Sequence, residues 1–376
     1  MVNASSKIRV GIVGMGRTAA FMRPVAAHPH ATLAAVCDLR EDICRTALNR
    51  YGIEAPQPAI YTDYETMLQA GVLDAVIIGT PVYAHVPQSI QALEENIHVF
   101  SEVPATWSLD EAKALVRACR ASRATYMMGE NSCYDRSIMT VRSMIEDGVF
   151  GYIHYAEGEY IHECLSLLKT TPWREALYAQ NGLVYTTHEI GPIMSLIGWD
   201  RIARLSAIGS GSHFTDKNGQ PYAQETRLVM QAQTAQGRLV RVCQDFQSPG
   251  THSHHRYVAQ GVKGRFESGY RDFPAQVMAT SIQDEKGSLV WKNLSEFEAN
   301  YLPDIWKRSE AEAKKHGHGG SDYVLINDYL DALWAEKPLP IDVWKALDMS
   351  LPGILSVASV RQQGAWVDVP DPRTWY

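Results

Sequence analysis

The 376-residue sequence lacks a long uninterrupted hydrophobic run. No stretch approaches the about 20 apolar residues that a membrane-spanning helix needs, so we expect no membrane partner. The first residues, Met1–Lys7, lead directly into a short apolar segment. This leaves no room for a secretory signal peptide and predicts a cytoplasmic location.

Paired cysteines and basic clusters are also missing. The six cysteines form no C-x-x-C motif, so we expect reduced, mostly buried thiols and no cysteine metal site. The formal net charge is -7 and no basic run follows the chain, which argues against a nucleic-acid partner. A hydrophobic content of 45% and a charged content of 20% are typical of a globular protein, long enough here for two domains.

What the sequence does contain is a glycine-rich turn directly after its first apolar run. Gly14, Gly16 and Ala19 follow Ile8–Val13 in the spacing G-x-G-x-x-A. The first glycine permits a tight turn, the second lets the backbone approach a pyrophosphate, and the third small residue lets a helix pack on the strand. The helix N-terminus would then direct its free N–H groups at the phosphates. The segment predicts a dinucleotide site.

A second apolar run ends at Asp38, where a carboxylate would bind the adenosine ribose hydroxyls. Its negative charge would repel a 2′-phosphate, so we expect NAD rather than NADP. Arg40 is the one nearby residue that could weaken this preference. The alternative interpretation, a glycine turn followed by an unrelated aspartate, is disfavoured by the strand–helix–strand context.

Strand-like and helix-like segments alternate as far as about residue 130. Ala75–Ile78 is fully apolar, as is typical of a parallel strand buried on both faces. Ser108, with Glu111 three residues later, predicts a helix N-cap with a capping box. The alternation predicts a doubly wound parallel sheet, a Rossmann domain, over residues 1–130. Cofactor and substrate should lie at the carboxyl ends of its strands.

Alternating runs with few helices dominate from about residue 152. They lie at residues 152–161, 202–209, 226–234, 239–245, 257–261 and 265–269, with a helix near 189–197 and a helical C-terminal third. These runs predict an open, mostly antiparallel sheet in a C-terminal α+β domain over residues 131–376. The open face should be buried against another subunit, so we expect a homo-oligomer.

Titratable residues gather in the second domain at places that do not suit a core. Tyr160 and His162 share one face at the end of a predicted strand, although edge decoration is an equally good interpretation. His188 follows Tyr185 where an apolar strand gives way to a helix, with Thr186 or Thr187 as its N-cap. The helix dipole there would favour a neutral imidazole, whether its role is packing or catalysis.

Two further histidine-rich stretches stand out. His318 lies between glycines ahead of a helix capped by Ser321 or Asp322, which would let backbone fold closely around a ligand. The run His252-Ser-His254-His255 invites a metal interpretation. No cysteine or carboxylate lies near it at ligand spacing, so we favour a polar loop and expect no metal site.

With these stretches in hand, the sequence resembles the Gfo/Idh/MocA superfamily over essentially its full length. The resemblance rests on the G-x-G-x-x-A opening, Asp38, Thr80-Pro81 with His85, the turn after the fifth strand, and the antiparallel second domain. It implies a bound NAD. The cofactor-binding residues that it implies are Gly14, Gly16, Arg17, Thr18, Ala19, Asp38, Thr80, Pro81, His85, Glu102 and Pro104.

One departure points to a branch of that superfamily. Most of its dehydrogenases have Glu-Lys-Pro at the turn, where the lysine transfers a proton, but this sequence has Glu102-Val103-Pro104. The chain is similar to the NAD-dependent retaining glycoside hydrolases of family 109, the α-N-acetylgalactosaminidase group. The further matches are Glu130-Asn131 ahead of Cys133-Tyr134, Tyr160 with His162, Tyr185-x-Thr-His188 with Gly191-Pro192, and His318-Gly-Gly-x-Asp322. Glu189 and Ser321 replace the usual Gly and Met.

The resemblance implies glycoside cleavage by a redox route. NAD⁺ would take hydride from C3 of the sugar, a base would remove the C2 proton, the C1 substituent would leave, water would add, and the hydride would return. Tyr160 would be the base, with its pKa lowered by neighbours from about 10, and His188 with Tyr185 would accept the C3 hydroxyl proton. The implied substrate-binding residues are Glu130, Asn131, His162, Trp173, Arg174 and His318.

Two other functions are compatible with the sequence. A net NAD-dependent sugar dehydrogenase or keto-sugar reductase would use the same site and release reduced cofactor. A cofactor-binding regulator without turnover would have little need for three titratable groups such as Tyr160, Tyr185 and His188.

Overall fold

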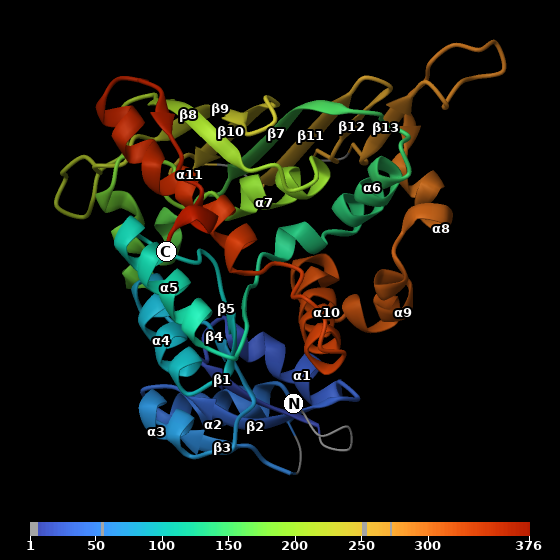
Figure 1. Cartoon of the computed structure of the whole chain (residues 1–376). Coiled ribbons are helices and arrows are strands. Elements are labelled where there is room, and N and C mark those ends of the chain that lie inside the picture. Colours follow the sequence, from blue (N-terminus) through green and yellow to red (C-terminus); the bar gives the residue numbers. More distant parts are fainter. Residues whose placement is uncertain (1–6, 54–55, 250–253, 271–272) are drawn as a thin grey trace. The chain divides into compact units, whose positions relative to one another are not determined.

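The computed structural model describes residues 7–53, 56–249, 254–270 and 273–376 (Figure 1). They form two compact units. The first unit comprises the described residues of Met1–Asn131 together with Arg308–Leu347 and Pro372–Tyr376, and the second comprises those of Ser132–Lys307 and Asp348–Asp371. We expected 131–376 to be one domain, but Arg308–Leu347 packs with the N-terminal part of the chain.

A parallel sheet forms the centre of the first unit. Within the described residues its strand order is β3-β2-β1-β4-β5-β6, and every pairing is parallel. The strands are β1 (Ile8–Val13), β2 (Ala31–Cys37), β3 (Ala59–Tyr61), β4 (Ala75–Ile78), β5 (His98–Ser101) and β6 (Tyr126–Met128). All four residues of β4 are buried, as its apolar sequence predicts. The predicted doubly wound sheet is confirmed.

The helices of this sheet follow the predicted order. They are α1 (Met22–Ala27), α2 (Glu41–Arg50), α3 (Tyr64–Gln69), α4 (Val82–Glu94) and α5 (Leu109–Ala121). At the start of α5, Ser108 Oγ accepts a hydrogen bond from Glu111 N at 3.2 Å, as the predicted N-cap requires. The Glu111 carboxylate accepts from Trp107 N at 2.9 Å rather than from the N-cap residue.

The helix after the glycine turn is shorter than the motif suggests. A 3-10 turn, η1 (Thr18–Phe21), comes first and α1 has only six residues. Pro24 inside α1 has no N–H to donate, so a long α-helix is disfavoured here.

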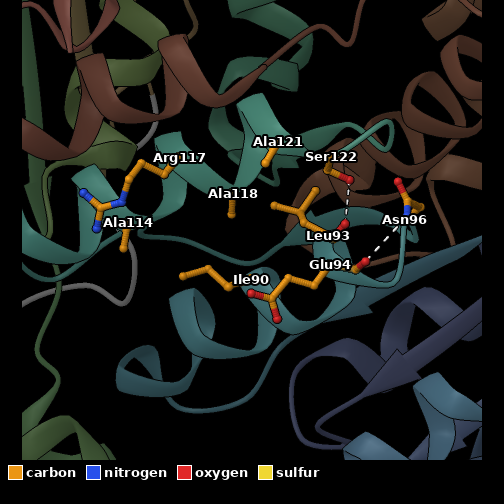
Figure 2. A pocket seen from close by; sticks show the side chains of 9 residues that line it. All are labelled: Ile90, Leu93, Glu94, Asn96, Ala114, Arg117, Ala118, Ala121 and Ser122. Carbon is orange, nitrogen blue, oxygen red and sulfur yellow. Dashed lines mark hydrogen bonds between the residues drawn. The ribbon is translucent and has the colours of Figure 1, made fainter. Parts of the chain in front are cut away.

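A surface pocket of about 510 Å³ lies between α4 and α5. Figure 2 shows the small side chains of Ala114, Ala118 and Ala121 on α5 across the gap from Ile90 and Leu93 of α4. All nine residues that line this pocket belong to α4, α5 or the residues just after them. None of them is among the residues expected to bind cofactor or substrate.

The C-terminal part of the first unit is held by specific contacts. It contains η6 (His318–Gly320) and α10 (Ser321–Trp334), and the first residues of α11 (Val343–Arg361). Met128 N donates to Ile341 O at 3.0 Å, and the Tyr329 ring of α10 lies 5.2 Å from the Phe100 ring of β5. An extended backbone and a buried aromatic pair therefore attach this segment to the parallel sheet.

The second unit contains the predicted, mostly antiparallel sheet. In the part of the chain that the structure describes, its order is β14-β13-β12-β11-β7-β10-β9-β8-β15. Only the β10–β7 pairing is parallel among these strands. The strands are β7 (Ile153–Ile161), β8 (Ile202–Gly209), β9 (Arg227–Thr234), β10 (Leu239–Asp245), β11 (His254–Gly261), β12 (Gly264–Glu267), β13 (Gln276–Ala279), β14 (Lys292–Asn293) and β15 (Val367–Asp368). The unit also contains α6 (Arg136–Glu146), α7 (Thr187–Leu196), α8 (Glu298–Tyr301) and the start of α9 (Asp304–Ala313).

The strand β11 differs from the prediction. It begins at His254 rather than Tyr257, so the expected polar loop is strand from residue 254 onward, while His252 lies outside the described residues. The additional residues pair with β7, and His255 lies opposite Tyr160. The C-terminal tail also adds β15 to the sheet.

The two faces of the large sheet have different chemistry. Buried residues alternate along β7, and Gly158 and Tyr160 face α7. On the other face, Arg241 of β10 lies 3.2 Å from Glu157 and 3.1 Å from Glu159. Arg256 of β11 adds to this ion-pair cluster at 3.8 Å from Glu157. The open face is thus half-buried and charged.

Of the helices in the described ranges, none is long and apolar enough to cross a membrane.

The close packing of α7 on β7 depends on Gly158. A Cβ atom at this position would lie 2.5 Å from Glu189 O, which is backbone and cannot rotate away. We expect Gly158→Ala to lower the free energy of unfolding by about 1–3 kcal/mol, as overpacking does. Thermal and urea unfolding would measure this. His154→Ala at an exposed position of the same strand is the control, and an equal effect of both changes would contradict the packing argument.

Candidate functional site

The predicted site residues fall into two groups, one in each unit. In the first unit, Gly14 has φ +87°, and a Cβ there would lie 2.6 Å from Gly79 O. Thr18 Oγ1 donates to Gly14 O at 2.6 Å and fixes the turn. At Gly16, by contrast, a Cβ would meet no atom within 4 Å, so its backbone faces open space. Ala19 is buried beneath the turn. An exposed glycine backbone beside a rigid turn fits a pyrophosphate.

The predicted ribose-binding residue lies beside this turn. Asp38 Oδ2 accepts a hydrogen bond from Met15 N at 2.9 Å, which holds the carboxylate next to the glycine loop. The Arg40 guanidinium pairs with Asp42, with Nε 3.1 Å from Oδ1, and its charge is thereby directed at a different carboxylate. The Asp38 carboxylate therefore fits the hydroxyls of an unphosphorylated adenosine ribose. Arg40, the residue that could have weakened the preference for NAD, pairs with Asp42 instead.

His85 links two of the predicted cofactor loops. Its Nε2 lies 2.8 Å from Thr80 O and its Nδ1 lies 3.1 Å from Pro104 O, and its side chain is buried. Burial lowers the pKa of His85, so the neutral form is favoured. Both ring nitrogens face carbonyl oxygens of the protein, and the single N–H of the neutral ring donates to one of the two. His85 therefore positions Thr80-Pro81 and Pro104 for the cofactor instead of presenting a polar atom to it.

Arg17 of the glycine loop is held between two carboxylates. Its Nη1 and Nη2 lie 2.9 and 2.7 Å from the Asp322 carboxylate, and its Nε lies 3.2 Å from Glu102. His318 Nδ1 lies 2.9 Å from the same Asp322 carboxylate. Burial opposes ionisation of Asp322, but the hydrogen bond from His318 and the charge of Arg17 outweigh it and hold the pKa of this carboxyl well below its usual range.

This network explains why the segment around His318 belongs to the first unit. His318, Gly319 and Gly320 all have positive φ, at 52°, 63° and 100°. This strained turn places His318 and Asp322 on Arg17, far from it in sequence. Glu130 and Asn131, predicted to bind substrate, follow β6 and are buried in this unit, with Glu130 fully enclosed.

The second group centres on Tyr160 in the second unit. Tyr160 Oη lies 2.6 Å from His162 Nδ1, and both residues are buried. The His188 ring stands edge-on to the Tyr160 ring at 5.1 Å, and the Tyr185 ring lies 5.4 Å from His188. The structure thus brings all three predicted catalytic side chains together.

The entry to α7 differs in detail from the prediction. Thr186 is the N-cap residue of α7, as expected, but its hydroxyl donates to Met349 O at 2.9 Å instead of capping the helix. The residues before it are irregular rather than a strand. Tyr257 Oη of β11 donates to His188 O at 2.7 Å, so the position of His188 is set from the sheet.

The carboxyl group of Glu189 is buried and is linked to the Tyr185 backbone through Gln244. Gln244 Nε2 of β10 donates to Tyr185 O at 2.7 Å and to Glu189 Oε1 at 2.9 Å. Glu189, which stands where the family resemblance leads us to expect glycine, is fully buried. Through Gln244, the Glu189 side chain therefore helps to hold the Tyr185–His188 segment in position.

The predicted substrate residues Trp173 and Arg174 lie on η4 (Pro172–Ala179). The Arg174 guanidinium stands 4.9 Å from the centre of the Trp173 ring, a cation–π arrangement. The positive charge of Arg174 also favours ionisation of Tyr160, which places this pair in the electrostatic environment of the cluster.

The prediction that neighbours lower the pKa of Tyr160 is wrong, because in this structure that pKa is raised. Burial raises the pKa of Tyr160 well above 10, and Tyr185, Cys164 and Glu189 add to the effect, while Arg174 opposes it. A phenolate in this apolar, aromatic environment is disfavoured. Its proton must therefore go to a neighbour whenever Tyr160 acts as a base.

One member of the cluster was missed by the sequence prediction. The His255 ring of β11 lies 4.6 Å from Tyr160 and 5.6 Å from His188. The histidine run around residue 254 was a signal, but the residue faces Tyr160 only because β11 pairs with β7 in this register. Within the described residues, no group of three His, Cys, Asp or Glu side chains is arranged to hold a metal ion.

Comparisons with known proteins match two consecutive parts of the sequence. Residues 134–374 match the family described as "Glycosyl hydrolase 109, C-terminal domain", and residues 8–130 match the Gfo/Idh/MocA "Oxidoreductase family, NAD-binding Rossmann fold". A glycosyl hydrolase family 109 protein of Saccharopolyspora erythraea is 31% identical over 98% of this chain and 84% of its own. Family 109 protein 2 of Shewanella sp. (strain ANA-3) is 30% identical over 99% of this chain and 86% of its own.

Solved structures share the fold. Levoglucosan dehydrogenase in complex with NADH and levoglucosan has a TM-score of 0.79 at 18% identity, covering 97% of this chain and 100% of that chain. An oxidoreductase from Agrobacterium radiobacter, in complex with NAD⁺, L-tartaric acid and magnesium, has a TM-score of 0.72 at 17% identity, covering 96% and 98%. Residues 8–130 of the first unit are an NAD-binding Rossmann domain.

The two glycines of the loop should respond differently to the same change. Gly14→Ala adds a Cβ against backbone at positive φ and should destabilise the apoprotein by about 1–3 kcal/mol. Gly16→Ala should leave the melting temperature of the apoprotein unchanged, because its Cβ meets no protein atom, but weaken NAD binding at least about tenfold by blocking the phosphates. Calorimetry with and without NAD separates the two, and undiminished NAD affinity of Gly16→Ala would refute the assignment.

The ion-pair network predicts a pH effect on stability. The hydrogen bond to Asp322 raises the pKa of His318 above its ordinary 6.5, so protonation is favoured in the folded state. The resulting stabilisation is fully present below the unfolded pKa and is lost as the pH rises through the folded pKa. His318→Asn should therefore lower the melting temperature more at about pH 5.5 than at about pH 8.5. In an Asp322→Asn background this difference should disappear; equal losses at both pH values would contradict the prediction.

Proposed function

Because the chain belongs to glycosyl hydrolase family 109 and is an NAD-dependent, sugar-active enzyme, we propose that it cleaves a glycoside through transient oxidation of the sugar at C3. The observation that supports this best is the buried Tyr160–His162 hydrogen bond of 2.6 Å with His188 beside it. A tyrosine and two histidines in one cluster can accept a proton from the C3 hydroxyl and another from the neighbouring carbon, C2.

Two proton acceptors are needed for the oxidation and the elimination. Bound NAD⁺ supplies a hydride acceptor, and the resulting C3 ketone acidifies the hydrogen on C2. His188 accepts the proton of the C3 hydroxyl, with Tyr185 steadying the oxygen. Val103, buried at the turn where related dehydrogenases have lysine, has no proton to transfer, so this role falls to His188.

Tyr160 removes the C2 proton, and His162 makes this possible. As the phenol oxygen takes the proton from C2, its own proton passes to His162 Nδ1, 2.6 Å away. The electron pair of the C2–H bond forms the C1–C2 double bond, and the C1 substituent leaves. No buried phenolate accumulates, which fits the raised pKa of Tyr160. We thus assign His162 to proton transfer instead of to sugar binding alone.

In the second unit, Trp173 offers an aromatic face and Arg174 a fork of donors for sugar hydroxyls. The roles of Glu130, Asn131 and His318 of the first unit in sugar binding stay predictions. The rival function is a net sugar dehydrogenase or keto-sugar reductase using the same groups. The fold it shares with levoglucosan dehydrogenase supports this rival, whereas Val103 and the family 109 match favour cleavage.

The charged open face of the large sheet supports a homo-oligomer. Its ion pairs, such as Arg241 with Glu157 and Glu159, are half-buried within one chain and would be covered by a second copy. This assembly and the cytoplasmic location stay predictions, as do the sugar substrate and the absence of a nucleic-acid partner.

Hydrogen at C2 distinguishes the functions. Elimination requires that the C2 hydrogen leave as a proton and be replaced from solvent, whereas oxidation at C3 alone leaves it in place. A panel of aryl glycosides incubated in heavy water should therefore release a sugar with deuterium at C2, while NADH never exceeds the enzyme concentration. Mass spectrometry and NMR of the product, with absorbance of NADH, would measure this.

Tyr160→Phe supplies the mechanistic control. It should slow cleavage and C2 exchange by about 10²- to 10⁴-fold yet still permit one reduction of bound NAD⁺, because hydride transfer precedes proton removal. Cleavage with C2 fully protiated would exclude the redox route. Stoichiometric NADH formation from a free sugar, with no glycoside cleaved, would establish the dehydrogenase instead.

A further inference from the structure

The leaving oxygen at C1 has no proton donor among the residues assigned so far. Elimination of an unactivated alcohol from C1 needs an acid, because an alkoxide is a poor leaving group. Tyr160 and His162 exchange the C2 proton, and His188 serves the C3 oxygen. A further titratable group close to all three would complete the reaction, and this inference rests on the proposed function.

His255 occupies that position. Its ring lies 4.6 Å from Tyr160 and 5.6 Å from His188, and Tyr160 and His188 are 5.1 Å apart, so the three rings form a nearly equilateral triangle. Antiparallel pairing places His255 directly opposite Tyr160, on the same face of the sheet. The next residue, Arg256, points to the other face, where it meets the Glu157–Glu159 cluster.

The spacing of the triangle suits three adjacent carbons of one ring. Substituents on C1, C2 and C3 of a sugar point outward from neighbouring atoms, so three groups a ring-width apart can each address one carbon. His255 and His188 are both half-buried, whereas Tyr160 and His162 are buried, and the Nε2 atom of His255 is itself enclosed. Because His188 serves the C3 oxygen, the position of His255 opposite Tyr160 assigns it to C1.

Other charged groups near Tyr160 do not meet these requirements. Arg174 does not release its proton in a protein, and Glu189 is fully buried and hydrogen-bonded to Gln244 on the far side of Tyr185. Tyr185 packs on His188 rather than opposite Tyr160.

We propose that His255 is the general acid that protonates the leaving oxygen at C1. As the C1–O bond breaks, the imidazolium proton of His255 passes to that oxygen, and the bonding electron pair leaves with it as a neutral alcohol. His255 is then neutral. It accepts a proton from the water that adds to C1, which restores the imidazolium for the next cycle.

The test compares leaving groups of different basicity. Dinitrophenyl, para-nitrophenyl and unsubstituted phenyl glycosides of a sugar that the wild type cleaves would be assayed with His255→Asn. The variant should lose less than about threefold on the dinitrophenyl glycoside, which needs no acid, and about 10²-fold or more on the phenyl glycoside. Deuterium exchange at C2 of the free sugar, which has no aglycone to expel, should stay within about threefold of wild type.

Controls distinguish this role from a structural one and from failure of the proposed function. His154→Asn, at an exposed position of β7, should leave all rates unchanged, and thermal unfolding with NAD titration would show that His255→Asn is folded and binds cofactor. A uniform loss across the three glycosides, or a parallel loss of C2 exchange, would overturn the assignment of His255 while the redox route stands. Absence of cleavage or of C2 exchange in the wild type would overturn both.

Discussion

The position of Arg17 between the Asp322 and Glu102 carboxylates is the interaction on which the first unit depends most. Burying the Asp322 carboxylate costs free energy unless it is paired, and the partly exposed guanidinium of Arg17 supplies that pairing. Their hydrogen bonds of 2.7 and 2.9 Å attach the turn at His318 to the glycine loop. A segment from the C-terminal third of the chain is therefore part of the first unit and holds the glycine loop in place.

In the second unit, burial rather than charge controls the chemistry. Tyr160 lies among His162, His188, His255 and Phe246, where a phenolate is poorly stabilised. Proton transfer between neighbouring groups at 2.6 Å avoids a lasting charge, so the cluster can remove a weakly acidic proton without an ionised base at rest. This arrangement suits removal of the C2 proton by a base that is neutral at rest, and it depends on the packing of β7, β11 and α7 on one another.

Close backbone approaches set the precision of both sites. The glycine turn is rigid because Gly14 leaves no space beside Gly79, and α7 sits tightly on β7 because Gly158 has no side chain. His188 is fixed at the start of α7 by Tyr257, through a hydrogen bond of 2.7 Å to its carbonyl. Small residues thus bring the polar groups into range, and the larger aromatic residues hold them there.

The two sheets, the dinucleotide loop and Asp38 could be predicted from the sequence, because apolar periodicity and glycine spacing are local properties of the chain. It also placed Tyr160 and His162 on one face, since side chains alternate along a strand. That residues 308–347 join the first unit could not be predicted locally, because the pairing of Arg17 with Asp322 spans most of the chain. The same holds for His255. Its role depends on the register of β11 against β7, and a shift of one residue would have turned it to the opposite face.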